Sequence, residues 1–123
     1  MSWVIELHDD FELEFKELSE AVQDELLAHA KLLETFGPRL GRPHVGTLKS
    51  SAHSNLKELR FDADNGVWRV AFAFDPKRCA ILLVAGDKTG GSGRRFYKKL
   101  IAKADTRFGA HLVQLRRKKK GEM

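Results

Sequence analysis

The sequence predicts an α+β fold in which a mainly antiparallel sheet of three to four strands packs against N-terminal helices and is followed by a C-terminal helix. Two observations carry this prediction. Residues 11–33 place apolar side chains at steps of three and four, which is the spacing of one stripe on an amphipathic helix. Residues 56–75 instead contain two stretches of alternating apolar and polar side chains around a short turn, which is typical of a hairpin. With 123 residues, the chain has the length of a single domain.

The N-terminal part predicts one strand and a divided helical region. Residues 3–7 alternate apolar and polar side chains and predict a short strand. Asp9 and Glu12 have the spacing of a capping box, so we expect the first helix to begin there. Ser19 can act as a second cap, which would separate a short helix from a longer one. A Gly-Pro pair ends the helical pattern, and residues 37–54 are expected to form a loop.

A hairpin is predicted around Asn65-Gly66, because Asn-Gly is the strongest short hairpin signal. With these two residues as the turn, Arg60 and Arg69 would be offset from each other across the hairpin. A four-residue loop would instead place the two arginines directly opposite each other, with the same parity. In both registers Glu58, Arg60 and Arg69 emerge on one shared polar face.

A third strand is predicted over residues 78–87, and its apolar run indicates a central strand that is buried on both faces. A connector rich in glycine leads into a last helix from Arg94 to about Phe108. We expect one domain over residues 1–112. Residues 113–123 contain five consecutive basic residues and are expected to form a solvated basic tail.

The charge of the chain is unevenly distributed. Residues 1–36 hold two Lys/Arg and ten Asp/Glu, a net charge of −8, whereas residues 37–115 hold fifteen and six, a net charge of +9. This asymmetry favours a surface that binds a polyanion, an acidic partner, or both. The plainer alternative is that an acidic helix and a basic sheet only solvate the domain.

Several kinds of site and location are disfavoured. The chain has no GxSxG, HExxH or CxxC motif, and its five histidines lack ligand spacing, so we expect no metal site and no cofactor. The longest apolar stretch, Cys79–Ala85, is far shorter than the ~20 residues of a membrane span. No basic leader with an apolar stretch follows the first residue, and the single cysteine fits a reducing compartment. We therefore expect a cytoplasmic protein without a membrane partner.

Basic side chains form the remaining candidate site. They come from the hairpin, from the end of the next strand and from the start of the last helix: Lys57, Arg60, Arg69, Lys88, Arg94, Arg95, Lys98 and Lys99. Arginine and lysine can hold a phosphate and neutralise charge that develops on it. Tyr97 could stack on a base or donate a proton to a leaving oxygen, and its alternative role is packing of the last helix. The alternative for the two hairpin arginines is pairing with Glu58 and Asp62 on an exposed strand.

One combination of segments resembles a known family. It consists of Leu-Lys-Glu-Leu-Arg-Phe at residues 56–61, Val-Trp-Arg-Val-Ala-Phe-Ala-Phe at residues 67–74 and Asp-Lys-Thr at residues 87–89, followed by a basic helix. Together they resemble the RelE/ParE toxin superfamily and, within it, the HigB-like, phage-related branch. The resemblance extends over residues 3–112 in the same element order, β-α-β-β-β-α.

The resemblance implies a toxin of a type II toxin–antitoxin system. Such a toxin would be an endoribonuclease that cuts mRNA on the ribosome without a metal, through attack of the substrate's 2′-hydroxyl on the adjacent phosphate. Its implied partners are mRNA, the ribosome and a cognate antitoxin, a helix-turn-helix protein of the HigA type.

The resemblance also implies roles for individual residues. Arg60 and Arg69 would grip and stabilise the scissile phosphate, with Lys88 beside them, and Glu58 would orient an arginine or act as a base. Tyr97 is a further catalytic candidate, and the proton acceptor stays unassigned. The expected RNA-binding residues are Lys57, Arg94, Arg95, Lys98 and Lys99.

Two other functions stay open. One is a ParE-like toxin that inhibits DNA gyrase by binding, and the other is a non-catalytic RNA-binding relative. The same fold can serve these activities, so the fold alone does not decide between them. Convergence of Arg60, Arg69 and Lys88 would favour RNA cleavage, because a binding protein does not require it.

Overall fold

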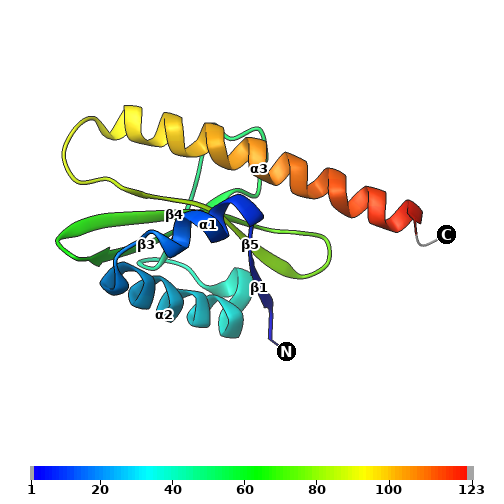
Figure 1. Cartoon of the computed structure of the whole chain (residues 1–123), viewed down its shortest axis with the longest axis horizontal. Helices are drawn as coiled ribbons and strands as arrows, with labels where there is room; N and C mark the ends of the chain where they lie inside the picture. Colours follow the sequence, from blue (N-terminus) through cyan, green and yellow to red (C-terminus); the bar gives the residue numbers. More distant parts are fainter. Residues whose placement is uncertain (1, 122–123) are drawn as a thin grey trace.

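A computed structural model describes residues 2–121, with side chains as far as residue 118. Helices cover both faces of the central sheet: in Figure 1, α3 runs along the top of the sheet and α2 along the bottom. The strands are β1 (Val4–Leu7), β2 (Val45–Thr47), β3 (Lys57–Ala63), β4 (Gly66–Phe74) and β5 (Cys79–Asp87). The helices are α1 (Asp9–Lys16), α2 (Glu20–Phe36), the short 3-10 helix η1 (Gly37–Arg39) and α3 (Gly93–Gly121). Within the described residues, none of the helices combines the length and apolar character needed to cross a bilayer.

The sheet has the strand order β1-β5-β4-β3-β2, in which β1 runs parallel to β5 and the other neighbours are antiparallel. The predicted α+β fold with a mainly antiparallel sheet is therefore confirmed. The sheet has five strands instead of three to four, because β2 forms within the segment that was predicted as a loop. A three-residue strand carries no periodic pattern of its own, and β2 is defined by pairing with β3, where Gly46 lies opposite Glu58.

Two hydrophobic cores lie on the two faces of the sheet. On the α1–α2 side, buried residues of β3 and β4 pack with the helices: Leu59, Phe61, Val70 and Phe72 with Phe11, Val22, Leu26 and Leu33. On the α3 side, the core contains Ala71, Ala73, Ile81, Leu83, Leu100, Ala104 and Phe108. Residues 80–84 are buried, so the prediction that this strand is covered on both faces is confirmed.

Of the two helix caps predicted from the sequence, the structure confirms one. Ser19 caps α2 as predicted, since its Oγ accepts a hydrogen bond from the Val22 N–H at 3.3 Å. The predicted capping box at Asp9 is wrong: His8 is the cap of α1, and its Nδ1 accepts from the Asp10 N–H at 3.2 Å. The His8 N–H also donates to the Leu82 carbonyl of β5, so β1 passes directly into α1 and leaves no room for a separate cap.

The turn between β3 and β4 differs from the predicted one. Ala63 pairs with Gly66, so the turn residues are Asp64 and Asn65, which have φ values of 51° and 61°. Two successive residues with positive φ are typical of a type I′ turn, whose twist matches that of the strands, and short polar side chains tolerate this backbone. The prediction that Asn65 and Gly66 form the turn is therefore wrong.

Gly66 is required in this hairpin for space. An added Cβ would lie 2.8 Å from Trp68 Nε1 and from Asp87 Oδ2.

The observed register places Arg60 directly opposite Arg69, which was the second of the two expected registers. A two-residue turn produces this register, instead of the four-residue loop that was expected with it.

The last helix is longer than predicted. It was expected to end near Phe108, with a solvated tail over residues 113–123, but α3 continues to Gly121. Lysine and arginine are good helix formers, so a run of basic residues indicates solvation without ending a helix. Residues 122 and 123 lie outside the described residues.

A forked ion pair joins the N-terminal and C-terminal helices. The Arg107 guanidinium of α3 donates to both carboxylate oxygens of Glu14 in α1 at 2.8 and 2.6 Å, and to the Leu83 carbonyl at 2.7 Å. The hydrogen bond from Arg107 lowers the pKa of Glu14 below its ordinary value of 4.5. The pair therefore stabilises the folded state above about pH 4.5, and this contribution is lost as the pH falls through the lowered folded-state pKa.

We expect Glu14→Gln to lower the free energy of unfolding at neutral pH by roughly 0.5–1 kcal/mol, the range of partly exposed ion pairs. At about pH 3 the difference between wild type and variant should shrink, because protonation of Glu14 weakens the same pair. Urea unfolding at the two pH values measures both quantities. A difference that stays constant down to pH 3 would contradict this role for the pair.

Candidate active site

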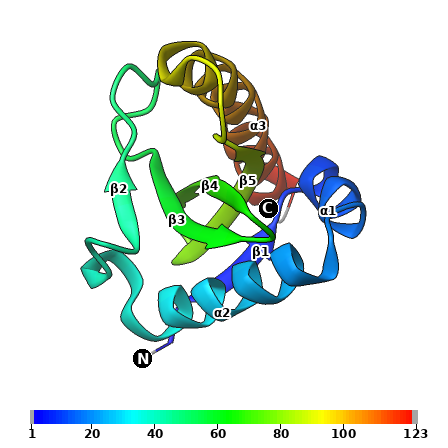
Figure 2. The ribbon, with the colours of Figure 1, turned by 90° about the vertical axis from the view of Figure 1, so that its left-hand side faces the viewer.

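A groove of about 700 Å³ lies between the β2–β3 end of the sheet and the first turns of α3. Figure 1 and Figure 2 show the segment after β2 rising to α3 and returning to β3, and it meets the helix near Asp105, to which Ser51 and Ala52 donate hydrogen bonds. Leu48, Lys49 and Ser50 of this segment line the groove. The groove is lined at its sheet end by Glu58 and Arg60, and on α3 by Arg94, Tyr97 and Lys98. Residues from distant parts of the sequence thus meet in one concave surface.

Glu58, Arg60 and Arg69 form a cluster at the sheet end of the groove. They share a face because Glu58 and Arg60 are two residues apart on β3 and Arg69 lies opposite Arg60 on β4. The Arg60 guanidinium donates to Glu58 Oε2 through Nε at 3.0 Å, and its Nη2 lies 2.9 Å from the same oxygen. The expectation that the two arginines and Glu58 share one polar face is confirmed.

Glu58 is far more buried than an exposed strand position would be, with 1% of the residue exposed. Its second oxygen, Oε1, faces Arg69 Nε at 3.8 Å, and within the described residues neither atom has a hydrogen-bond partner. Arg69 is held from its other end, where Nη1 donates to the Trp68 carbonyl at 2.8 Å. A buried carboxylate between two guanidinium groups compensates part of their charge and leaves the cluster with a net positive charge.

Arg60 lies across β2, over Gly46. A Cβ on Gly46 would come within 2.5 Å of Arg60 Nη2, so only glycine leaves room for the guanidinium in this position. Arg60 is also the more accessible of the two arginines, with 34% of its side chain exposed against 14% for Arg69. Gly46 was not among the predicted site residues, although a glycine within a strand can mark a close approach of another group.

Tyr97 and Lys88 lie next to each other beside this cluster. Lys88 Nζ is 5.7 Å from the centroid of the Tyr97 ring, and the Lys88 N–H donates to the Val67 carbonyl at 2.7 Å. Burial raises the pKa of the Tyr97 phenol and Glu58 adds to the rise, whereas Arg69 opposes it. The phenol is therefore protonated at neutral pH and can donate a hydrogen bond or a proton.

The close approach of α3 to the sheet also depends on a glycine. Gly86 lies opposite Arg69, and a Cβ on it would come within 2.8 Å of the Phe96 ring at the start of α3. Tyr97 packs against the core on the α3 side and also lines the groove, so it has both of the positions that the sequence left open.

The basic residues predicted to bind RNA divide into three groups. Arg94 and Lys98 line the groove. Arg95 and Lys99 are exposed on α3 and lie outside the groove lining, because a helix turns neighbouring residues by about 100°. Lys57 lies on the opposite face of β3, with Nζ 5.9 Å from the centroid of the Phe74 ring, so its grouping with the cluster is wrong. Alternation along the strand separates Lys57 from Glu58.

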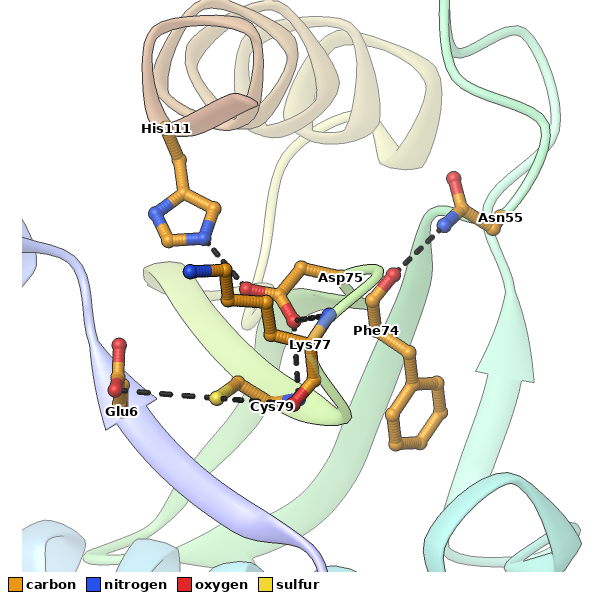
Figure 3. Close-up of polar contacts among 7 residues, drawn as sticks. All are labelled: Glu6, Asn55, Phe74, Asp75, Lys77, Cys79 and His111. Atoms are coloured by element: carbon orange, nitrogen blue, oxygen red, sulfur yellow. Dashed lines mark hydrogen bonds and ion pairs between the residues drawn. The ribbon is translucent and has the colours of Figure 1, made fainter. Parts of the chain in front are cut away.

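A second polar cluster lies at the turn between β4 and β5 (Figure 3). Asp75 Oδ1 accepts from the N–H groups of Lys77 and Cys79 at 2.9 and 3.0 Å, and Oδ2 lies 2.8 Å from His111 Nε2 of α3. These bonds close the turn and attach it to the helix. Burial raises the pKa of the Cys79 thiol, and acidic neighbours, including Glu6, raise it further, so the thiol is protonated at neutral pH.

The groove offers donors and positive charge, and its one carboxylate near the arginines is already hydrogen-bonded. Among the described residues, no histidine lines the groove, and no group of three or more His, Cys, Asp or Glu side chains is arranged to hold a metal ion. The arrangement offers an anion in the groove the positive charge of Arg60 and Arg69, with Tyr97 in the lining beside them. These are the elements for binding and polarising a phosphate.

The sequence matches one family of proteins and is similar to two proteins of Mycobacterium tuberculosis. Residues 13–109 match the profile of the family described as phage-derived protein Gp49-like. HigB2 of Mycobacterium tuberculosis is 41% identical over 104 residues, which cover 78% of this chain and 51% of HigB2. HigB3 of the same organism is 50% identical over 76 residues, which cover 62% of this chain and 64% of HigB3. Both are candidate toxins by name, and this chain spans about half to two thirds of their lengths.

Two solved structures share the fold. A mutant of the E. coli toxin RelE in the free state has a TM-score of 0.58 and 10% identity, covering 84% of this chain and 97% of that chain. The archaeal RelE-RelB complex from Pyrococcus horikoshii has a TM-score of 0.54 and 19% identity, covering 74% and 100%. The fold is therefore that of RelE, and the profile match includes the whole arginine cluster and Tyr97. The chain belongs to the phage-derived Gp49-like family, and within that family it is similar to HigB2 and HigB3 and has the fold of RelE.

Proposed function

We propose that this protein is the toxin of a type II toxin–antitoxin system and that it is an endoribonuclease that cleaves mRNA on the ribosome. The observation that carries the proposal is the cluster of Arg60, Arg69 and Glu58 at the end of a basic groove, beside a protonated Tyr97. The names of the M. tuberculosis relatives support the toxin role. The cytoplasm, where mRNA is translated, is the location that this activity requires.

In the proposed reaction the 2′-oxygen of the substrate forms a bond to the adjacent phosphorus, and the bond from phosphorus to the 5′-oxygen breaks. Negative charge grows on the non-bridging oxygens in the transition state, where Arg60 and Arg69 stabilise it. Tyr97 donates its proton to the leaving 5′-oxygen, and Lys88 near the ring favours the developing phenolate. The products are a 2′,3′-cyclic phosphate and a 5′-hydroxyl.

Glu58 acts in this mechanism as a positioning residue. Its carboxylate is buried and already accepts the hydrogen bond from Arg60, which suits it to orienting that guanidinium and not to removing a proton from substrate. The group that accepts the proton of the 2′-hydroxyl is not assigned to a residue of this chain.

We also propose a cognate antitoxin of the HigA-like, helix-turn-helix kind as the partner that neutralises the toxin. The P. horikoshii structure is a complex of RelE with RelB, and this precedent for a bound partner within the fold supports the proposal. The net charge of −8 on residues 1–36 offers a surface for a basic partner on the helices, apart from the basic groove.

Mapping of RNA ends tests the proposed function. After induction in a bacterial host, growth should stop, and translated messages should carry new 5′-hydroxyl ends. With purified protein and programmed ribosomes, a chelator selective for transition metals should leave the cleavage rate unchanged. Cleavage that leaves 5′-phosphate ends would contradict the mechanism. Intact messages together with gyrase-dependent DNA damage would contradict the function and favour gyrase binding.

Gly46→Ala tests the placement of Arg60. The new methyl group should displace the guanidinium, and we expect cleavage to slow on the order of 10-fold or more, since a misplacement of about 1 Å can cost ~10²-fold. Gly41→Ala is the matched control, because a Cβ there meets nothing within 4 Å. Cleavage of message on purified ribosomes, with circular dichroism as a check of folding, compares the two variants. Equal rates for both would show that Arg60 does not depend on Gly46.

A further inference from the structure

The chain leaves β5 through Asp87, Lys88 and Thr89, and the proposed mechanism uses only the middle one of these residues. Asp87 and Thr89 are exposed, yet they are bonded to each other. Asp87 Oδ1 accepts a hydrogen bond from the Thr89 hydroxyl at 2.6 Å and another from the Thr89 N–H at 2.9 Å. The bonds from Thr89 lower the pKa of Asp87 below its ordinary value of 3.8, so the carboxylate is charged at neutral pH. Residues 87–89 therefore form a closed turn, which we call the Asp87–Thr89 turn.

The start of β4 holds this turn in place. The Val67 N–H donates to Asp87 Oδ1 at 3.1 Å and to Thr89 Oγ1 at 3.0 Å. In the other direction, the Lys88 N–H donates to the Val67 carbonyl at 2.7 Å. Both backbone polar groups of Val67 are thus bonded to the turn, and the backbone of Lys88 is fixed against the sheet through its own N–H and through both of its neighbours.

Beyond the turn, the chain has open space around it. Gly90 and Gly91 have φ values of 72° and 70°, and a Cβ on either residue would meet nothing within 4 Å. The next regular element, α3, begins at Gly93. The direction in which Lys88 leaves the sheet is therefore set by the Asp87–Thr89 turn and not by packing of the residues that follow it.

This direction matters because the Lys88 side chain reaches a different element. Lysine carries its charge on a long stem with many rotamers, and a fixed backbone reduces the number of positions that its ammonium can reach. Lys88 Nζ lies 5.7 Å from the centroid of the Tyr97 ring on α3, within the range in which an ammonium is attracted to an aromatic face. The contact between sheet and helix at this point thus depends on where the backbone of Lys88 is held.

We propose that Asp87 and Thr89 are positioning residues, which hold the backbone of Lys88 so that its ammonium stays beside the Tyr97 ring. The inference rests on the proposed function, in which Lys88 favours the developing phenolate of Tyr97. It adds two residues that need no contact with the substrate, and it predicts that both act on cleavage only through Lys88.

NMR spectroscopy measures the position of Lys88 without any cleavage. Protons near the face of an aromatic ring resonate upfield, so the ε-methylene signal of Lys88, assigned by its absence from Lys88→Met, should lie upfield of the signals of exposed lysines. Asp87→Ala and Thr89→Val should each move this signal to the position of the exposed lysines. Asp62→Ala is the matched control, because Asp62 is an exposed carboxylate opposite Val67 on β3, and it should leave the signal in place.

Single-turnover cleavage on programmed ribosomes tests whether this position matters for the reaction. Asp87→Ala and Thr89→Val should each slow cleavage about 10-fold, because the ammonium is displaced from its place beside the ring. Thr89→Ser keeps the hydroxyl and should cleave faster than Thr89→Val. In a protein that already carries Lys88→Met, Asp87→Ala should slow cleavage by less than about twofold, since no ammonium is left to position, whereas a purely structural effect would appear in full.

The outcomes separate this inference from the proposed function. The inference is overturned if the wild-type Lys88 signal is not upfield, if Asp87→Ala or Thr89→Val leaves it in place, or if the effects of Asp87→Ala and Lys88→Met on cleavage multiply. A protein that cleaves, but whose Lys88 signal stays in place in the turn variants, keeps the proposed function and loses the inference. A protein that does not cleave, but whose Lys88 signal moves in both variants, loses the proposed function and keeps the positioning of Lys88 by the turn.

Discussion

Arg69→Ala should lower the rate of mRNA cleavage on the order of 10²-fold or more, comparable to the loss of one oxyanion donor. Arg69 is oriented by its bond to the Trp68 carbonyl and lies beside Glu58, so its charge is fixed before the substrate arrives. A charge that needs no reorganisation acts mainly in the transition state, so we expect the effect on the rate constant of single-turnover cleavage. Growth on induction should recover in parallel.

Two further variants make this result specific. Arg69→Lys keeps the charge but not the planar fork and should remain well below wild type. Lys118→Ala, at an exposed position of α3, should change cleavage little beyond weaker electrostatic attraction. Because only 14% of the Arg69 side chain is exposed, Arg69→Ala should also lower the free energy of unfolding, by about 1 kcal/mol. If Arg69→Ala remains fully toxic, the cluster is only a charged surface.

Glu58→Gln should separate RNA binding from RNA cleavage. The neutral amide keeps the shape of the side chain but no longer compensates Arg60 and Arg69, which lie directly opposite each other. We expect the free energy of unfolding to fall on the order of 2 kcal/mol, as for loss of hydrogen bonds to a charged group. RNA binding should not weaken, because a negative charge near the phosphate is removed, whereas cleavage should slow about 10-fold or more as Arg60 loses its orientation.

Asp62→Asn is the matched control for this variant. Asp62 lies on the same face of β3, two residues beyond Arg60, but it is exposed, so its replacement should change stability by less than about 0.5 kcal/mol. Urea unfolding, anisotropy with uncleavable RNA and single-turnover cleavage measure the three quantities. If the Glu58→Gln protein has unchanged stability and an unchanged cleavage rate, Glu58 does not position Arg60.

Part of the candidate site follows from the sequence because it depends on alternation alone. Side chains two residues apart on a strand share a face, so Glu58 and Arg60 belong together in either register. The same rule places Lys57 on the other face, and grouping it with the cluster by charge gave the wrong result. Arg94 and Lys98 likewise share one face of α3 because four residues complete about one turn.

Other features have no local signal. β2 is a three-residue strand whose pairing comes from β3, and His8 became a cap because β1 continues directly into α1. No local pattern predicts the burial of Glu58 either, because alternation only places it on a polar face, and α3 covers that face in the folded protein. Gly46 shows its purpose only when Arg60 lies over it.

The sequence by itself determined the α+β class, the common face of Glu58, Arg60 and Arg69, and the concentration of positive charge after residue 36. The fold class and the common face depend on contacts between near neighbours in the chain, and the spacing of apolar residues and the turn residues reveal such contacts. The concentration of charge follows directly from the residue counts. Only the tertiary structure decided the hairpin register, the burial of Glu58 and the groove itself. The groove exists because residues far apart in the chain are brought into contact, as Ser51 and Asp105 are across 54 positions, and no local pattern carries that information.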